Sequence, residues 1–323
     1  MTINSYAQNY EDVILWRALS HVENGIYVDI GAAYPIDDSV TMLFYEKGWT
    51  GVNVEPDARL FQLLNSERTR DTNLSVAIGR ESGRQELFIV SNQGLSTLDI
   101  DVAREHEAAG FTFQVQPVEI KTLCAVLETT VEDSPIHFLK VDVEGAESDV
   151  LASNDWSRFR PWIVVVETAG QQRTGENLSA PSTSEPAVQL EDYMSSVDYE
   201  CVYLDGLNSF FVANEHPELF SRPVLPPNVF DNFITSSEER ATRRSVAMEA
   251  QAHQAELRAI RIAQRSDEAA VASARDAAAS AREIAILAHK LENLSLDLAN
   301  VQQSISWKIT RPLRAIKRFL QGH

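Results

Sequence analysis

The chain has 323 residues, of which 44% are hydrophobic and 8% aromatic, so it holds enough apolar side chain for a packed core and is excluded from the disordered class. Its formal net charge of −19 is unevenly placed: residues 1–237 carry 14 basic and 37 acidic side chains, a net −23, whereas residues 238–323 carry 14 and 10, a net +4. The strongly acidic first part would repel a phosphate backbone, which argues against nucleic acid as its partner.

Short apolar runs rich in β-branched and aromatic residues predict five main strands in the first part of the chain. They cover residues 26–31, 51–56, 73–79, 136–142 and 162–167, with one extra strand over 85–90. Helical segments over 40–48, 57–66 and 144–152 lie between them, and Asp57 is a suitable N-cap for the second. The runs 199–204 and 209–213 flank a turn and predict a closing antiparallel hairpin. Because strands alternate with helices, we expect a Rossmann-like, doubly wound α/β fold with a mostly parallel sheet.

Residues 170–186 interrupt this alternation. They are rich in Gly, Ser, Thr, Glu and Pro and show no periodicity. We expect a long loop at the carboxyl end of the fifth strand, and loops of this length are usually functional or disordered.

From about residue 237 the composition becomes that of a long helix. Gly and Pro are absent until Pro312, and Ala, Glu, Arg and Gln dominate. We therefore divide the chain into a globular domain over 1–236, a long helix over 237–305 and a tail over 306–323. Seven apolar residues of the helix step by alternating intervals of three and four, which predicts a coiled-coil seam of about three heptads for self-association or for a partner coiled coil: Ile284, Leu287, Leu291, Leu294, Leu298, Val301 and Ile305.

The tail over 306–323 has five basic residues and no acidic one, with apolar side chains at helical spacing. Such a segment can lie on an anionic membrane surface, or it can be a solvated basic tail. No signal-peptide pattern follows Met1, and no stretch approaches the ~20 apolar residues of a spanning helix. We expect a cytoplasmic protein, with peripheral contact at the inner face of the membrane through this tail.

Acidic residues close four of the predicted strands: Asp29, Glu55, Asp142 and Glu167. In an open α/β sheet, ligands bind beyond the carboxyl ends of the strands, near the point where the strand order reverses. Four acids at such ends are hard to explain as helix caps alone. We therefore expect a ligand site that they share.

The first loop, from Asp29 to Ala33, contains Gly31 but lacks the other two glycines of the dinucleotide-binding fingerprint. Gly31 lets the backbone turn sharply and approach a ligand closely. Glu55, which ends the next strand, can accept both hydroxyls of a ribose. The same acid would suit S-adenosylmethionine or a nicotinamide dinucleotide, so a dinucleotide-dependent oxidoreductase stays open as an alternative.

Several motifs together resemble the FkbM family of methyltransferases. The most distinctive is the block from Lys140 to Gly145, with lysine, aspartate, glutamate and glycine in order, and one departure is Tyr34, where the family pattern has a histidine before a proline. The matching segments are 5–12, 27–32, 48–56, 94–98, 139–147, 160–162 and 205–208.

The resemblance implies a class I methyltransferase sheet, S-adenosylmethionine as the methyl donor, and O-methylation of sugars or polyketide-type hydroxyls. It places Asp29, Gly31 and Ala32 at the methionine end of the donor and Glu55 at the ribose. Ala77 and Ile78 would flank the adenine, Asp142 would face the sulfonium and the acceptor, and Ser96 and Thr97 are candidates for the acceptor pocket.

A neutral hydroxyl acceptor needs a base, and Asp142 or Glu144 could take its proton if its pKa is raised. His137 is an alternative base, although it lies near the start of its strand. Asp142 with Glu167 could instead hold a divalent cation such as magnesium. We expect an O-methyltransferase acting on a sugar or glycan hydroxyl. A non-catalytic scaffold, in which the coiled coil is the working part, is a further alternative.

Overall fold

The computed structural model describes residues 2–90, 96–168 and 185–310. The chain forms two compact units, Met1–Thr242 and Arg243–His323.

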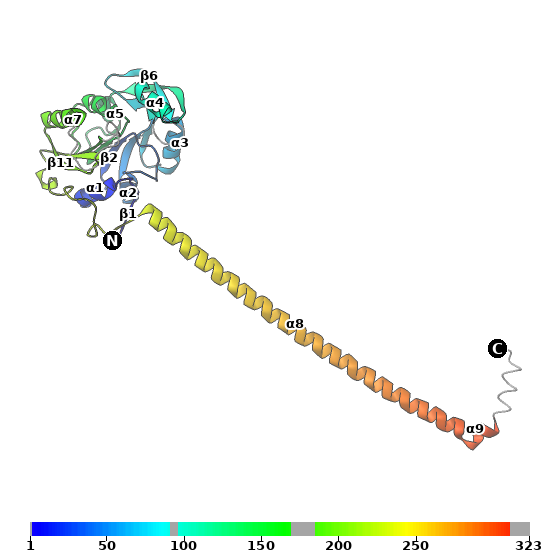
Figure 1. Cartoon of the computed structure of the whole chain (residues 1–323). Coiled ribbons are helices and arrows are strands. Elements are labelled where there is room, and N and C mark those ends of the chain that lie inside the picture. The colour runs from blue at the N-terminus through cyan, green and yellow to red at the C-terminus, as the bar shows by residue number, and fades with distance from the viewer. Residues whose placement is uncertain (1, 91–95, 169–184, 311–323) are drawn as a thin grey trace. The chain divides into compact units, whose positions relative to one another are not determined.

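A seven-stranded sheet is the centre of the first unit (Figure 1). Its strand order is β11-β12-β10-β9-β2-β3-β4. The five neighbouring strands β10, β9, β2, β3 and β4 are parallel to one another, whereas β12 runs antiparallel to both β10 and β11. The fold is therefore the expected α/β fold, with an antiparallel closing hairpin. The strands are β2 Ile26–Ile30, β3 Thr50–Val54, β4 Thr72–Leu74, β9 Phe138–Val141, β10 Ile163–Glu167, β11 Tyr199–Leu204 and β12 Asn208–Ala213.

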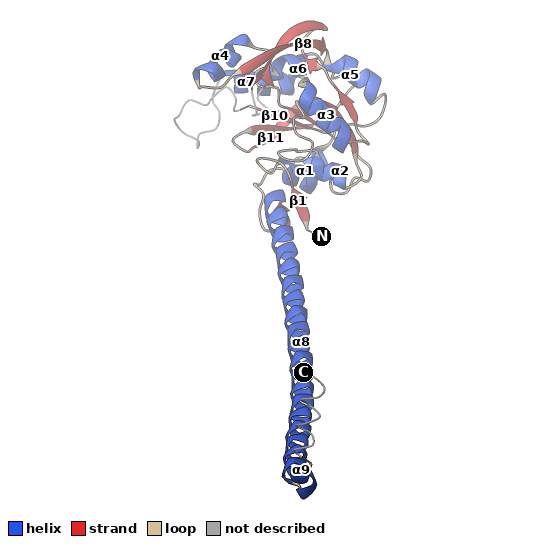
Figure 2. Cartoon of the chain, turned by 90° about the vertical axis from the view of Figure 1, so that its right-hand side faces the viewer, coloured by secondary structure: helices blue, strands red, loops and turns tan. Residues whose placement is uncertain are grey.

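Helices cover both faces of this sheet because successive strand residues point to opposite sides. Val28 and Ile30 pack with α5, α6 and α7 on one face, whereas Tyr27 packs with α1 and α2 on the other (Figure 2). Asp57 caps α3 by accepting a hydrogen bond from the Arg59 amide, as expected. The helices are α1 Glu11–Leu19, α2 Met42–Glu46, α3 Ala58–Glu67, α5 Leu123–Thr130, α6 Glu147–Ala152 and α7 Glu185–Ser196.

A second, four-stranded sheet has the order β5-β8-β6-β7 and is mostly antiparallel. The prediction of one strand over 73–79 is wrong, because the chain leaves the central sheet after β4 and Ala77–Ile78 pair with the end of β8 instead. The extra strand predicted over 85–90 lies within β6. The strands are β5 Ala77–Ile78, β6 Gly83–Val90, β7 Ser96–Thr97 and β8 Phe113–Lys121, and helix α4 Ile100–Ala108 precedes β8.

A short parallel pair joins the beginning of the chain to the segment before the long helix. Strand β1, Ile3–Ser5, pairs residue by residue with β13, Phe233–Thr235. Asn4 donates a hydrogen bond to Glu239 at 2.8 Å, and the Arg17 guanidinium forms two hydrogen bonds with the Asp231 carboxylate, each 2.7–2.8 Å long. The segment that leads into the long helix is thus fixed to the first unit.

The long helix predicted from the composition is confirmed. Helix α8 spans Ser236–Gln303, contains 68 residues and has no buried one. A short helix α9, Ile305–Ile309, follows it. Of the five basic residues of the tail, only Lys308 lies within the described part. The loop predicted over 170–186 lies outside the described part, except for its last two residues, which begin α7. No helix in the described ranges is long and apolar enough to cross a membrane.

Candidate active site

The register of the parallel strands brings the predicted strand-end residues together. Ile30 of β2 lies beside Val54 of β3 and Val141 of β9, and Val141 lies beside Val166 of β10. The next residue or two after each of these positions therefore emerges at the same edge of the sheet. This edge includes the point where the strand order reverses, between β2 and β9. The residues that emerge at this edge are Gly31, Glu55, Asp142 and Glu167.

A cavity of about 370 Å³ opens at this edge. Its volume falls in the range of small-molecule sites. Asp29 and Thr97 are not among the described residues that line it, although the sequence placed them at the donor and in the acceptor pocket. The other candidates from the sequence do line it: Gly31, Ala32, Glu55, Ala77, Ile78, Ser96, Asp142, Glu144 and Glu167.

Gly31 forms a tight turn against the adjacent strand. Its φ is +81°, a left-handed conformation that favours glycine. A Cβ added to it would lie 1.8 Å from the backbone carbonyl oxygen of Asp142. The amides of Gly31 and Ala32 both donate to the carbonyl of Val54, at 3.0 and 3.1 Å. The absence of a side chain at Gly31 is what lets the two strand ends approach at the floor of the cavity.

Glu55 is buried at the cavity wall and oriented by two backbone amides. Its Oε1 accepts from the Asp57 amide at 2.8 Å, and its Oε2 accepts from the Ala33 amide at 2.9 Å. Burial raises the pKa of Glu55 to about 7, although both amide bonds act in the opposite direction. Each carboxylate oxygen keeps a further lone pair, so the side chain can still accept two hydroxyl groups of a ligand.

Asp29 lies behind the cavity because it stands one residue before the end of β2 and its side chain is short, whereas its register partner Lys140 has a longer one. Its Oδ2 accepts from the Thr41 hydroxyl at 3.2 Å, and its Oδ1 lies 3.8 Å from the ammonium of Lys140. Burial raises the pKa of Asp29, against the positive charges of Lys140 and Arg68. The side chain that reaches the cavity from this pair is Lys140, not Asp29.

Lys140 was not singled out as a site residue by the sequence. Its ammonium donates to Asp142 Oδ2 at 2.9 Å. Burial opposes its charge, but the Asp142 and Asp29 carboxylates outweigh burial and raise the pKa of Lys140. A lysine inside the apolar run of β9 was the available signal, since a lysine is almost never buried unless it is paired.

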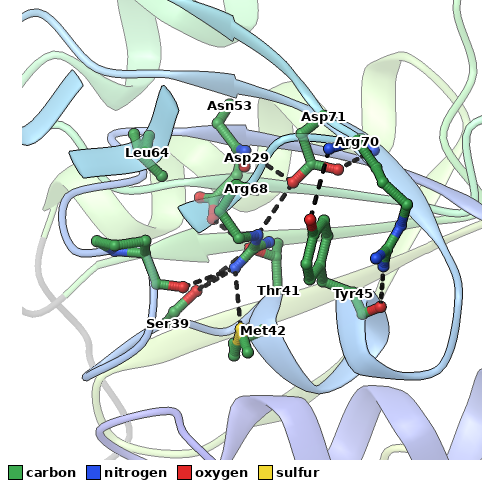
Figure 3. A network of polar contacts seen from close by, with 12 residues as sticks. Asp29, Ser39, Thr41, Met42, Tyr45, Asn53, Leu64, Arg68, Arg70 and Asp71 are labelled. Atoms are coloured by element: carbon green, nitrogen blue, oxygen red, sulfur yellow. Dashed lines mark hydrogen bonds and ion pairs between the residues drawn. The ribbon is translucent and has the colours of Figure 1, made fainter. Parts of the chain in front are cut away.

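A buried polar network contacts Asp29 through Thr41 (Figure 3). The Arg68 guanidinium is fully buried and donates to the Thr41 hydroxyl at 2.7 Å and the Tyr27 hydroxyl at 2.8 Å. Its Nε forms an ion pair with Asp71 at 3.0 Å. Polar contacts thus run from Asp71 through Arg68 and Thr41 to Asp29, whose other carboxylate oxygen lies 3.8 Å from the Lys140 ammonium.

Asp142 and Glu167 share a hydrogen bond between their carboxyl groups. Burial acts to raise the pKa of Asp142, but the Lys140 charge and the Glu167 hydrogen bond outweigh it and hold the pKa below its usual value. Burial, and then the hydrogen bond to Asp142, raise the pKa of Glu167 to about 9. The pair therefore carries one proton near neutral pH, and Asp142, the base expected from the sequence, is the weaker base of the two.

The expected divalent cation would compete with Lys140 for this pair. One Asp142 oxygen is taken by the Lys140 ammonium, at 2.9 Å. Within residues 2–90, 96–168 and 185–310, no group of three or more His, Cys, Asp and Glu side chains is placed to hold a metal ion.

Three further candidates from the sequence, Glu144, Thr97 and His137, lie in different places. Glu144 lines the cavity with a left-handed backbone, φ 52°, and helix α6 begins after it, at Glu147 rather than at the expected 144. Thr97 is buried and donates to the Glu144 carbonyl at 3.1 Å, so it supports that loop from behind. His137 accepts the Ile26 amide at the opposite end of the strand, which removes it from the candidates for the base.

A mostly parallel α/β sheet with a small-molecule cavity at its strand ends defines a ligand-binding α/β protein. Residues 29–201 match the methyltransferase FkbM domain, and the chain belongs to the FkbM methyltransferase family. None of the curated proteins compared with the chain matches it.

One solved structure with similarity to the chain comes from Pyrococcus horikoshii and is described as a "putative RNA methyltransferase". The similarity has a TM-score of 0.34 and 10% sequence identity, and it covers 64% of this chain and 82% of that chain. It is too distant to assign a function.

Proposed function

We propose that this chain is an S-adenosylmethionine-dependent O-methyltransferase on a Rossmann-like, class I sheet, and that its acceptor is a sugar or glycan hydroxyl. The observation that carries the proposal is the strand register, which presents Gly31, Glu55 and Asp142 to one cavity. Glu55 would hold the ribose, and Gly31 and Ala32 would lie against the methionine end. Ala77 and Ile78, two apolar side chains that line the cavity, would flank the adenine.

The charge of the cavity supports a cationic donor and a neutral acceptor. Lys140 is the one cation among the described lining residues, and its charge is offset by Asp142 and Asp29. A phosphate or carboxylate group on the acceptor would meet repulsion here, whereas a neutral hydroxyl would not. The acidic lining residues are Asp38, Glu55, Asp142, Glu144 and Glu167.

Two measurements test this function. Calorimetry should give tighter binding of S-adenosylmethionine and S-adenosylhomocysteine than of NAD or NADP. Ala33 and Ile36 occupy the positions where the dinucleotide fingerprint needs its second and third glycines. Incubation with methyl-labelled S-adenosylmethionine and a panel of neutral glycans should then transfer label to a hydroxyl. Tighter dinucleotide binding would replace the proposal by an oxidoreductase, and binding of neither would favour the scaffold.

We also propose that α8 joins two or more copies of the chain as a coiled coil. The heptad side chains of this helix are at least half exposed, and burying them against an identical stripe is how a long amphipathic helix is stabilised. The exposed fractions are 67% for Ile284, 53% for Leu287, 68% for Leu291, 64% for Leu294, 57% for Leu298 and 50% for Val301.

The test compares two double variants by light scattering. Leu291→Asp with Leu298→Asp should dissociate the assembly and leave donor binding unchanged. Ile286→Asp with Leu296→Asp is the matched control, because both residues are exposed but lie off the seam, at 58% and 57%. A monomeric wild-type chain would refute self-association and leave a partner coiled coil as the alternative.

The basic tail over 306–323 is proposed to contact anionic membrane surfaces. Sedimentation with phosphatidylserine vesicles should recover the protein at low salt and lose it at 1 M salt, where screening shortens to ~3 Å. Equal recovery with neutral vesicles would rule out the electrostatic contact.

A further inference from the structure

We propose that the Asp142–Glu167 carboxyl pair releases its shared proton when the cationic methyl donor binds, and that Glu167 then takes the proton of the acceptor hydroxyl. This inference rests on the proposed function, since it needs a sulfonium donor in the cavity. It makes Glu167, which the sequence offered only as a metal ligand, the catalytic base.

The geometry gives the two carboxyls different roles. They leave adjacent parallel strands at the same level, because Val141 and Val166 are register partners, and both line the cavity. One Asp142 oxygen is held by the Lys140 ammonium at 2.9 Å, which keeps that carboxyl ionised. Glu167 forms no ion pair within the described residues. It is therefore the member of the pair that can gain and lose a proton.

The backbone of Glu167 is held by its neighbours in the sheet. Glu167 is the register partner of Asn208 in β12, and the following amide, of Thr168, donates to the Leu207 carbonyl at 2.9 Å. The Asn208 side chain is itself bound to Glu11 at 2.7 Å and to Asp205 at 3.2 Å. The backbone that carries the proposed base is thus fixed by the sheet.

The charges around Glu167 explain why it holds a proton in the free protein. Asp142 and Glu144 are acidic neighbours, and Lys140 is the opposing cation. On the β12 side, Glu11 and Asp205 are acidic too. Burial, the hydrogen bond to Asp142 and the charges of Asp142 and Glu144 raise the pKa of Glu167 to about 9, against the charge of Lys140. An opposite charge within about 4–6 Å lowers the pKa of a carboxyl by roughly 1–3 units, which would bring Glu167 into the neutral range.

The step balances in atoms and charge. The acceptor oxygen forms a bond to the methyl carbon while the carbon–sulfur bond breaks and its electron pair stays on sulfur. The acceptor proton passes to the Glu167 carboxylate. The sulfur product is neutral, so the pair ends the cycle with the one proton it held at the start, and the net proton of the reaction is the one released on donor binding.

The test is the number of protons released on binding, measured by calorimetry at neutral pH in two buffers of different ionisation enthalpy. S-adenosylmethionine should release more protons than S-adenosylhomocysteine, by up to about one, because S-adenosylhomocysteine lacks the methyl group and its sulfonium charge. The affinity for S-adenosylmethionine should rise about tenfold per pH unit between the two pKa values, and that for S-adenosylhomocysteine should not. Neither measurement needs an acceptor.

Variants assign the proton to one side chain. Glu167→Gln resembles the protonated form, so it should fold, bind both compounds and abolish the difference in proton release. Glu128→Gln, an exposed carboxyl paired with Arg158, is the control and should keep the difference. Equal proton release by the two compounds, or a difference that survives in Glu167→Gln and disappears in Glu144→Gln, would overturn the inference while leaving the methyltransferase intact. Failure to bind S-adenosylmethionine at all would overturn the proposed function itself.

Discussion

Replacing Gly31 by alanine should damage both the stability of the first unit and its donor site, and Gly48 offers a matched comparison. Both glycines have a left-handed φ, +81° and +93°. A Cβ on Gly48 would meet nothing within 4 Å, whereas a Cβ on Gly31 would lie 1.8 Å from the Asp142 carbonyl oxygen. The difference between the two alanine variants therefore isolates the collision from the cost of the backbone conformation.

The expected losses of stability follow from the cost of the left-handed backbone and from the collision with Asp142. A left-handed alanine costs about 1–2 kcal/mol, and the loss of glycine flexibility in the unfolded chain returns about 0.4–1 kcal/mol, so Gly48→Ala should cost about 1 kcal/mol. In Gly31→Ala the Asp142 backbone must also move by more than an ångström, which breaks the 3.0 Å bond from the Asp142 amide to Ile30. A buried group left unsatisfied adds about 1–3 kcal/mol.

Thermal unfolding and donor binding measure both effects. For a unit of this size 1 kcal/mol corresponds to about 2–4 °C in the unfolding temperature, so Gly48→Ala should lose about 2–4 °C and Gly31→Ala about 5–15 °C. Turnover of Gly31→Ala should fall on the order of 100-fold, because misplacing reacting groups by about 1 Å has that effect. Equal unfolding temperatures and unchanged S-adenosylmethionine binding in the two variants would refute the account of the strand ends.

Three further predictions concern the carboxyl groups of the first unit. Glu55→Ala should weaken S-adenosylmethionine binding by about 5–150-fold in calorimetry, the effect of an unsatisfied partner worth about 1–3 kcal/mol, and an unchanged dissociation constant would remove Glu55 from the site. Asp142→Asn should leave the circular dichroism spectrum unchanged but lower kcat by about 10²–10⁴-fold, the contribution of a general base, because it removes the carboxyl that is paired with Glu167, the proposed base; near-normal turnover would contradict this. Burial raises the pKa of Asp12 to about 7, so its contribution to stability is present below about pH 4 and is lost as the pH rises through about 7. The free energy of unfolding in urea should fall over this window, and less steeply in Asp12→Asn; parallel curves would show that Asp12 does not titrate there.

The sequence predicted the site edge well because the central strands are continuous apolar runs that end where their polar residues begin. In a parallel sheet such ends meet at one edge, so Gly31, Glu55, Asp142 and Glu167 could be grouped before the fold was known. The placement of Asp29 failed for a related reason. It is the last residue but one of β2, where its short side chain contacts Thr41 and only the longer side chain of its register partner Lys140 reaches the cavity.

Other features depend on contacts between distant segments, which a one-dimensional pattern does not contain. Strand β8 was missed because Pro117 interrupts its run, and a proline argues against a strand by the usual rules. Arg68 follows a helix in an ordinary polar stretch, and nothing there indicates that its guanidinium is buried against Tyr27 and Thr41. Predicting the proton shared by Asp142 and Glu167 requires both the strand register and the position of Lys140.

Because β1 pairs with β13, the first unit is complete only when the chain includes both strands. The match to the family domain stops at residue 201. The first residues of the protein, however, pair with Phe233 and Glu239, which lie more than thirty positions beyond residue 201. A fragment that ended with the family match would therefore leave β1 without its partner strand and Arg17 without Asp231. Helix α8 also contacts the first unit through the ion pair of Arg240 with Asp37, the neighbour of the cavity-lining Asp38.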